Sequence, residues 1–336
     1  MMKKSTFFLL FSIALSSCNF FKSEPTETVE NTQTSVDTLL ATPTFNADSA
    51  YSYIEKQLSF GYRVPNSAAH EKCANYLISF FKQYADTLYT QKYTVKAFDG
   101  NQLKSTNIIA SFNPKAVSRI MLSAHWDSRP FADQDTINEN DPILAANDAG
   151  SGVAVLMEIA RALKAQPIQI GVDLILFDAE DYGQPMNSKF PRMEDSYCLG
   201  SQYWANLPHV ANYRADFGIN LDMVGAPDAV FMHEQFSATN ADWVGQYVWG
   251  FADRLGYGSL FVPQLASGVT DDHYYVMQGR KFPVIDVIHY SNTGGFGEFW
   301  HTHQDNINWI SKSTLTAVGR TMLQTIYQYN AEKKTV

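Results

Sequence analysis

Two neighbouring carboxylates follow an apolar run in the sequence. Residues 174–177 are Leu-Ile-Leu-Phe, and Asp178, Glu180 and Asp181 come shortly after them. Adjacent carboxylates repel each other at neutral pH, so this pair needs either a solvated turn or a compensating partner. Successive side chains of an extended segment point to opposite sides. One carboxylate can therefore bind a metal ion while its neighbour moves a proton.

Asp148 is a further candidate metal ligand. It stands in Ala-Ala-Asn-Asp-Ala-Gly-Ser-Gly (145–152), directly before a predicted helix at 150–164. Asp is also a good helix N-cap, which is the alternative interpretation of this residue. The flanking Gly150 and Gly152 and the apolar residues before it favour a ligand. Catalytic zinc typically has three protein ligands and one open position, so a carboxylate here would need partners elsewhere.

An imidazole partner is available near the end of the chain. Glu-Phe-Trp-His-Thr-His-Gln-Asp-Asn (298–306) contains His301 and His303. The chain has eight histidines, and most of them must be structural or exposed. His301 differs from the others because Trp300 precedes it directly.

The predicted elements place these side chains at one edge of a sheet. Short, nearly continuous apolar runs predict buried strands, and two earlier segments alternate or are β-branched. The predicted strands are 88–98, 105–112, 119–125, 171–178, 217–223 and 282–289. Helical spacing predicts helices at 49–61, 68–84, 150–164, 198–206, 240–255, 272–279 and 312–331. This alternation predicts an α/β fold with three α/β/α layers around a central, mixed but mostly parallel sheet.

Polar residues gather at the ends of the predicted strands. His125 and Asp127 end one run, Glu180 and Asp181 follow the next, and Asp222 ends the third. Active groups of such sheets collect beyond the carboxyl ends of the strands. We therefore expect these side chains to lie close together.

Composition limits the classes of function. The chain has 336 residues, 45% of them hydrophobic, enough for one sizeable core. Its net charge of -9 argues against a nucleic-acid partner, because phosphates demand basic surface. Cys73 and Cys198 could form a disulfide or remain two buried thiols; neither has the spacing of a metal site, and the sequence does not decide between these alternatives.

The first residues predict export. Lys3 and Lys4 precede a short apolar stretch at 7–15, as in a signal peptide. Leu-Ser-Ser-Cys at 15–18 resembles the lipobox of bacterial lipoproteins, in which the Cys is acylated; an ordinary signal peptide with a chance Cys is the alternative. We expect a signal peptide at 1–17, lipidated Cys18 and a flexible tether at 18–44, and a single catalytic domain at 45–336. The expected location is the bacterial cell envelope, on the periplasmic side, with membrane contact through the lipid only.

Six motifs in fixed order carry a resemblance to a known family. They are Ser-Ala-His-Trp-Asp-Ser, Ala-Ala-Asn-Asp-Ala-Gly-Ser-Gly, Phe-Asp-Ala-Glu-Asp, Asn-Leu-Asp-Met-Val-Gly-Ala-Pro, Thr-Asp-Asp-His and Phe-Trp-His-Thr-His-Gln-Asp-Asn. The sequence resembles the zinc-dependent glutaminyl cyclases of the animal type, glutaminyl-peptide cyclotransferases that also occur in bacteria. That family shares its fold with zinc aminopeptidases.

The resemblance implies the composition of the site. It implies one zinc ion per chain, held by Asp148, Asp181 and His301, with Glu180 as the residue that transfers the proton. Further implied residues are Asp222 and Asp271 as an acidic network beside Glu180, and Trp300 in the substrate pocket, to which Phe296 would add a second aromatic wall. Asp272 is adjacent to Asp271, so one of the two would be only the N-cap of the helix at 272–279.

The resemblance also implies a reaction. An N-terminal glutaminyl residue of a peptide or protein would become pyroglutamyl, with release of ammonia. We expect a monomer whose partners are peptides and proteins beginning with Gln.

A two-zinc aminopeptidase is the main alternative, because His125, Asp127, Asp222 and His301 supply the residue types for a second metal. Three features favour the cyclase. They are Trp300 before His301, Gly225-Ala226-Pro227 after the Asp222 motif, and the long insertion at 182–199. A non-catalytic lipoprotein that only binds is a second alternative.

The chain also departs from the animal cyclases. Asp181 stands where they have Glu, and the Trp that they carry a few residues later has no counterpart in Tyr-Gly-Gln-Pro-Met-Asn-Ser (182–188).

Overall fold

A six-stranded sheet forms the centre of the computed structural model, which describes residues 39–334. In spatial order the strands are β1 (Thr87–Lys96), β2 (Gln102–Phe112), β4 (Gly171–Phe177), β3 (Arg119–His125), β5 (Phe217–Asp222) and β8 (Val284–Ile288). β4, β3, β5 and β8 are parallel, whereas β1 and β2 pair antiparallel at one edge. The sheet is therefore mixed and mostly parallel, as predicted.

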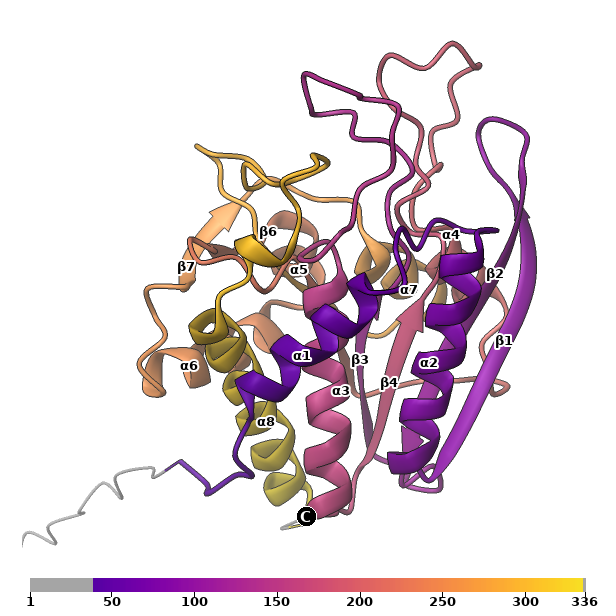
Figure 1. Ribbon diagram of the computed structural model, residues 1–336. Helices are drawn as coiled ribbons and strands as arrows, with labels where there is room; N and C mark the ends of the chain where they lie inside the picture. Colours follow the sequence, from indigo (N-terminus) through magenta and orange to yellow (C-terminus); the bar gives the residue numbers. More distant parts are fainter. Residues whose placement is uncertain (1–38, 335–336) are drawn as a thin grey trace, which may run out of the picture. The chain divides into compact units, whose positions relative to one another are not determined.

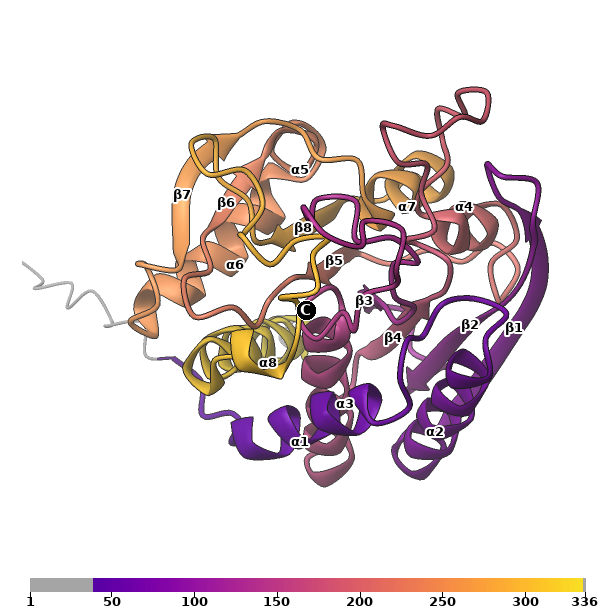
Figure 2. The same ribbon diagram turned by 45° about the horizontal axis from the view of Figure 1, so that its top comes forward.

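Helices cover both faces of this sheet (Figures 1 and 2). One layer contains α1 (Ala47–Leu58), α2 (Ala68–Tyr84), α3 (Gly150–Ala165) and α8 (Lys312–Lys334). On the other face lie α4 (Leu199–Asn206) and α7 (Asp272–Arg280), which pack on each other. The remaining elements gather near β8: α5 (Gln235–Asn240), α6 (Asp242–Arg254) and a small parallel sheet of β6 (Phe231–Glu234) and β7 (Phe261–Ala266). A short 3-10 helix, η1 (Ile307–Trp309), precedes α8.

The apolar strands contribute side chains to two hydrophobic cores, one on each face of the sheet. Neighbouring side chains of a strand face opposite sides of the sheet. On β3, Ile120 and Leu122 join the core under α3 and α8, while Met121 joins the core under α4 and α7. This is why the central strands are apolar along their length rather than alternating.

Gly152 brings α3 close to the sheet. A Cβ atom at this position would lie 2.3 Å from the carbonyl oxygen of Leu221 and 2.9 Å from Cβ of Ala124. Only glycine permits so close an approach. The first turn of α3, and with it the loop that carries Asp148, is therefore held against the ends of β3 and β5.

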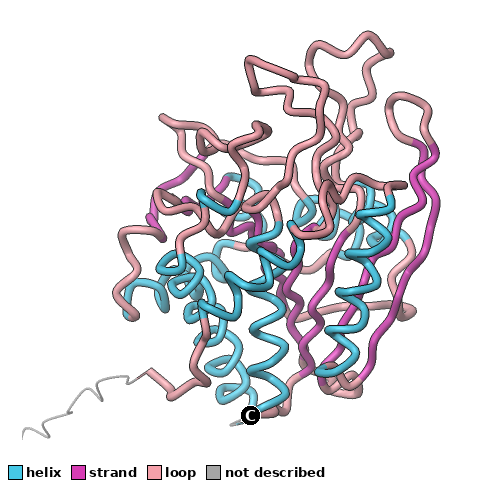
Figure 3. Tube along the Cα trace, viewed as in Figure 1, coloured by secondary structure: helices cyan, strands magenta, loops and turns pink. Residues whose placement is uncertain are grey.

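The long loops lie at one end of the molecule, beyond the carboxyl ends of the parallel strands (Figure 3). They include the segments around Asp148, Glu180 and His301, which are far apart in the sequence. The topology thus brings the candidate residues to one edge, as expected.

The strands and helices predicted from the sequence are all present, with ends shifted by a few residues. β6, β7 and α5 were not predicted. β6 has four residues, and β7 contains Pro263 and is largely exposed, so neither shows a clear hydrophobic pattern. Between residues 39 and 334, no helix is long and apolar enough to cross a membrane. The predicted signal peptide, Cys18 and most of the tether lie outside the described residues.

Candidate active site

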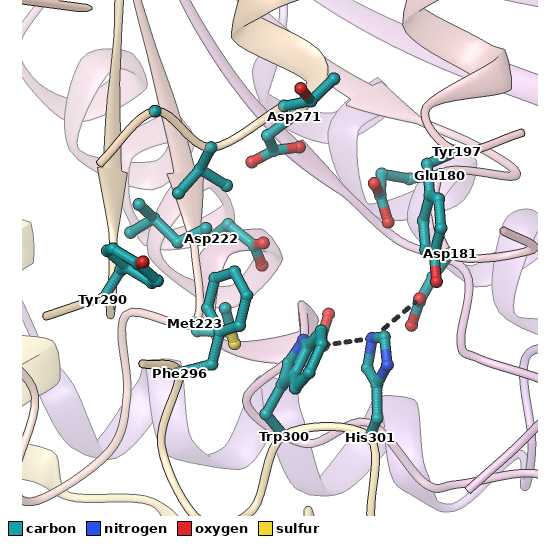
Figure 4. A pocket seen from close by; sticks show the side chains of 15 residues that line it. Glu180, Asp181, Tyr197, Asp222, Met223, Asp271, Tyr290, Phe296, Trp300 and His301 are labelled. Carbon is teal, nitrogen blue, oxygen red and sulfur yellow. Dashed lines mark ion pairs between the residues drawn. The ribbon is translucent and has the colours of Figure 1, made fainter. Parts of the chain in front are cut away.

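A cavity of about 360 Å³ opens at the carboxyl ends of the parallel strands. All the candidate ligands, acidic residues and aromatic residues implied by the resemblance line it (Figure 4). They are Asp148, Glu180, Asp181, Asp222, Asp271, Phe296, Trp300 and His301. The remaining lining residues are Tyr197, Met223, Tyr290, Ile288 and the segment 268–270.

Asp148, Asp181 and His301 form a compact set of metal-binding groups. One ligand atom from each lies within 4.8 Å of the others, and all three residues are buried. His301 Nε2 is 3.3 Å from Asp181 Oδ1 and 3.9 Å from Asp148 Oδ2. Asp181 Oδ2 is buried without a hydrogen-bond partner in the described part of the chain. Two carboxylates and one imidazole beside an open cavity, with an Asp181 oxygen still free to bind, fit a catalytic zinc ion.

The N-cap interpretation of Asp148 is wrong. The cap of α3 is Ala149, which makes no side-chain capping bond. Asp148 Oδ1 instead lies 2.9 Å from His125 Nε2. The backbone N–H groups of Asn147 and Asp148 donate to the Asp305 carboxylate at 2.7 and 3.0 Å. Asp305 thus fixes the loop so that Asp148 faces the cavity.

Glu180 and Asp181 turn to different partners. Asp127 accepts hydrogen bonds from both backbone N–H groups, at 3.1 Å from Glu180 and 3.2 Å from Asp181. This contact holds the pair in place and gives Asp127 a role that the sequence did not reveal. Asp181 faces His301, whereas Glu180 lies beside Asp271 and Cys198.

The environments push the two pKa values apart. Burial raises the pKa of Glu180 well above its ordinary value; His125 opposes this, and Asp181 and Asp271 add to it. Burial alone would also raise the pKa of Asp181, but His301 and Arg129 outweigh it and lower that pKa. A neighbouring pair in which one carboxyl has a much higher proton affinity than the other suits a proton carrier next to a metal ligand.

An ion pair ties together two of the candidate ligands. The guanidinium of buried Arg129 contacts Asp133 through Nε at 2.6 Å and Nη2 at 2.9 Å. Its Nη1 donates to the carbonyl oxygen of Asp181 at 3.0 Å and to Oδ1 at 3.1 Å. Asp133 Oδ1 also lies 3.2 Å from His301 Nδ1. Such outer contacts orient metal ligands and tune their basicity. Nothing in the sequence pattern singled out Arg129 or Asp133.

Asp271, rather than Asp272, lines the cavity, and it is also the N-cap of α7. Its side chain accepts from the Asp272 N–H, and its Oδ2 accepts from Asn220 Nδ2 at 2.8 Å. The cavity residue and the helix N-cap are therefore the same residue, Asp271. Asp222 reaches the cavity from the end of β5, with a pKa raised to about 8 by burial and by Asp148.

A second group of possible ligands shares Asp148 with the first. His125, Asp148 and Asp222 each offer an atom within 4.8 Å of the others. His125 Nε2 lies 3.5 Å from Asp222 Oδ1. The residues for a second metal ion are thus adjacent in space as well as present in the sequence.

Aromatic side chains form the wall of the cavity. The Trp300 and His301 rings stack with their centroids 3.8 Å apart. The centroid of the Phe296 ring lies 4.4 Å from that of Trp300 and 5.0 Å from that of Tyr290. His301 itself has a φ of +54°, a left-handed conformation that costs energy for a residue with a Cβ atom. Ala145, Ala179 and Met223, which flank other candidate residues, share this conformation. Such strain concentrates at functional sites.

Tyr197 is a wall residue that the sequence did not reveal. It lies beside Glu180 and Asp181 in Figure 4 and comes from the far end of the insertion at 182–199. A Cβ atom at Gly183 would lie 2.2 Å from its ring, and the Arg129 guanidinium is 5.2 Å from the ring centroid. The insertion therefore contributes an aromatic ring to the cavity wall beside the acidic pair.

Three further residues considered from the sequence, Cys73, Cys198 and His303, are not among the residues that line the cavity. Cys73 and Cys198 are both free and buried, so the disulfide alternative does not hold. His303 bonds Asp135 at 2.9 Å and does not line the cavity.

Solved structures resemble the chain over most of its length. A Zn-dependent exopeptidase from Parabacteroides distasonis is 47% identical, with a TM-score of 0.84 over 85% of this chain and 99% of that chain. The glutaminyl cyclase of Bacteroides thetaiotaomicron, solved with N-acetylhistamine, is 44% identical, with a TM-score of 0.83 and the same coverage.

Curated relatives point to the same two activities. An aminopeptidase of Bacillus subtilis is 28% identical over 71% of this chain, and the bovine glutaminyl-peptide cyclotransferase is 26% identical over 67%. The matches span 48% and 66% of these relatives' own lengths. Residues 107–326 match the model of peptidase family M28. The matched segment contains every candidate ligand. The chain therefore belongs to peptidase family M28, a zinc-dependent family.

Proposed function

We propose that the protein is a glutaminyl-peptide cyclotransferase that converts N-terminal Gln of peptides and proteins to pyroglutamyl. The observation that carries the proposal is the cavity itself. An aromatic wall of Tyr290, Phe296 and Trp300 stands beside one complete ligand set, with Glu180 on its rim. A cavity of about 360 Å³ suits one folded-over residue. The 44% identity to a solved glutaminyl cyclase supports the same activity.

The proposed reaction divides into binding, attack and departure. Asp148, Asp181 and His301 would hold the zinc ion, which when bound supplies Lewis acidity to the side-chain carbonyl oxygen of the substrate. Trp300 and Phe296 hold the glutamine folded, with its α-amine near the side-chain carbonyl carbon. A new C–N bond forms to the α-nitrogen, and the bond to the amide nitrogen breaks.

Glu180 moves the proton between the two nitrogens. Its carboxylate takes a proton from the attacking α-amine and gives it to the departing nitrogen, which leaves as ammonia. Asp181, Asp271 and Asp272 surround this carboxyl with further negative charge. Their repulsion helps to keep its pKa high enough for both steps.

The experiment compares two peptides. Purified protein is incubated with one peptide beginning with Gln and one beginning with Leu, and both are followed by mass spectrometry. We expect ammonia loss from the Gln peptide and an intact Leu peptide. Glu180→Gln should lower kcat by about 10²- to 10⁴-fold, the usual contribution of a general base, and retain its zinc. Removal of leucine without cyclisation would contradict the proposal.

A two-metal aminopeptidase is the second candidate function. The His125, Asp148 and Asp222 group favours it, because a shared carboxylate between two ligand sets suits a pair of metal ions. The two functions differ in their need for His125. His125→Ala should abolish a two-metal peptidase, whereas a one-zinc cyclase should retain measurable turnover.

We also propose that the enzyme is a monomer anchored to the cell envelope through acylated Cys18, facing the periplasm. The lipobox-like Leu-Ser-Ser-Cys at 15–18 supports this. Membrane fractions of cells making wild-type protein and Cys18→Ala test it. The wild type should fractionate with membranes and carry a lipid-shifted mass, and the variant should carry no such shift. An identical distribution and mass of both proteins would contradict the anchor.

A further inference from the structure

Cys198 contacts Glu180 at two points. Its Sγ lies 3.0 Å from Glu180 Oε1, and its backbone N–H donates to the Glu180 carbonyl oxygen at 2.8 Å. Asp271 Oδ1 lies 4.0 Å from the same sulfur. All three residues are buried. No other side-chain contact to the Glu180 carboxyl is as short among residues 39–334.

The backbone around Cys198 fixes this geometry. Cys198 and Ala179 both have a φ of +56°, and the Leu199 N–H donates to the Ala179 carbonyl oxygen at 3.1 Å. A Cβ atom at Gly200 would lie 2.2 Å from the carbonyl oxygen of Asp178. Only glycine lets the first turn of α4 come so close to the strand end. The side chain of residue 198 is therefore directed at the Glu180 carboxyl by the main chain and not by loose packing.

The thiol is a donor in this contact. Burial, and then the charge of Glu180, raises the pKa of Cys198 well above its ordinary value, so the sulfur keeps its proton. A protonated thiol is a weak donor, and a carboxylate oxygen is a good acceptor. The other oxygen, Oε2, makes no hydrogen bond within the described residues, and Glu180 lines the cavity.

We propose that Cys198 is a positioning residue for Glu180, whose Sγ–H ties Oε1 and leaves Oε2 as the oxygen that moves the substrate proton. The inference rests on the proposed cyclase function, since it assigns a task to the proton carrier of that reaction. It explains why a cysteine that neither forms a disulfide nor joins the zinc ligands lies against the acidic pair.

Four variants of the full-length protein test the proposal. Cys198→Ala removes the donor, and Cys198→Ser restores a donor on a shorter side chain. Cys198→Gly also lacks the donor, but it relieves the left-handed backbone strain and so remains usable if Cys198→Ala does not fold. Cys73→Ala is the matched control, because Cys73 is equally buried but lies in α2, away from the cavity.

The readouts are kcat and KM for a Gln peptide, with zinc content and thermal unfolding measured on each variant. We expect Cys198→Ala and Cys198→Gly to lower kcat about tenfold, since a misplaced proton carrier slows the chemical step, with KM changed less than about twofold. Cys198→Ser should recover most of kcat. Cys73→Ala should lower the unfolding temperature and leave kcat unchanged.

Two results would overturn the assignment. One is wild-type kcat in Cys198→Ala, and the other is a Cys198→Ser protein as slow as Cys198→Ala while both retain zinc. In both cases the wild type still cyclises the peptide, so the proposed function survives. A wild type that does not cyclise the Gln peptide would remove both proposals together.

Discussion

At the residue scale, the site depends on contacts that hold its charged groups in fixed orientations. Asp127 holds the backbone of the acidic pair, Asp305 holds the loop of Asp148, and the Arg129–Asp133 pair holds Asp181 and His301. None of these three supports touches the centre of the cavity. These three supports hold the carboxylates of the site in one fixed arrangement, although the carboxylates repel one another.

Asp133→Asn should weaken zinc binding about 10- to 100-fold, the usual effect of losing an outer contact to a metal ligand. The variant loses the negative charge that pairs with Arg129 and faces His301 Nδ1. Competition with a chelator of known affinity measures this, and Asp135→Asn is the control because Asp135 contacts His303 outside the cavity. Equal zinc affinity of wild type and Asp133→Asn would show that the ion pair does not orient the ligands.

Part of this site was accessible from the sequence. Residues at strand ends, such as Glu180, Asp181 and Asp222, could be placed because parallel strands end at one edge. The Tyr197 ring in the cavity wall and the Arg129–Asp133 pair behind the ligands could not, because loops whose paths no periodicity specifies carry them to the site. Motif order suggested Asp271, but only the structure separated it from Asp272.

At the scale of elements, close backbone contacts position α3 and α4 against the strand ends. Gly152 and Gly200 occupy places where a Cβ atom would overlap main-chain atoms of Leu221 and Asp178. Each glycine lies in the first turn of a helix that follows a candidate residue of the site, Asp148 before α3 and Cys198 before α4. The close approach of α3 and α4 to the strand ends therefore determines where Asp148 and Cys198 lie.

Gly152→Ala should destabilise the protein by about 3 kcal/mol or more, because overpacking against main-chain atoms cannot be relieved by side-chain rotation. Gly250→Ala in α6 is the matched control. Nothing lies within 4 Å of a Cβ atom there, so alanine should stabilise that helix by about 0.5–1 kcal/mol. Urea unfolding at neutral pH measures both free energies of unfolding. A stable, fully active Gly152→Ala protein would contradict the close packing of α3.

The large elements were predictable and the small ones were not. Apolar runs such as 171–178 and the helical face of 68–84 are long enough for burial to dominate local preferences. β6 and β7 form a two-stranded sheet whose residues are partly exposed and whose pairing depends on β8 and α6. This small sheet therefore forms through tertiary contacts, and no local sequence pattern predicts it.

At the scale of the whole molecule, buried imidazoles link stability to pH. His209 accepts a hydrogen bond from Trp204 Nε1 at 3.1 Å and packs against Tyr89 and Tyr213. Burial lowers its pKa from 6.5 to about 4. Between these values the unfolded chain binds a proton that the folded chain does not, so stability present above pH 6.5 is lost as pH falls toward 4.

His209→Gln should therefore unfold less readily in acid relative to the wild type. Glutamine can still accept from Trp204 but does not titrate. We expect the wild type to lose about 2 kcal/mol more than the variant when the pH falls from 7 to 4.5. Urea midpoints at the two pH values measure the difference. Equal acid losses in the two proteins would show that His209 is protonated in the folded state.

In the proposed enzyme, one zinc ion in one cavity supports one reaction, the cyclisation of N-terminal Gln. The most direct measurement adds zinc stepwise to metal-free protein, with Gln and Leu peptides together in the same tube. Ammonia loss from the Gln peptide should rise until one equivalent of zinc per chain is bound and then level off, while the Leu peptide should stay intact. Release of leucine that grows with a second equivalent would contradict it and make the protein a two-metal aminopeptidase.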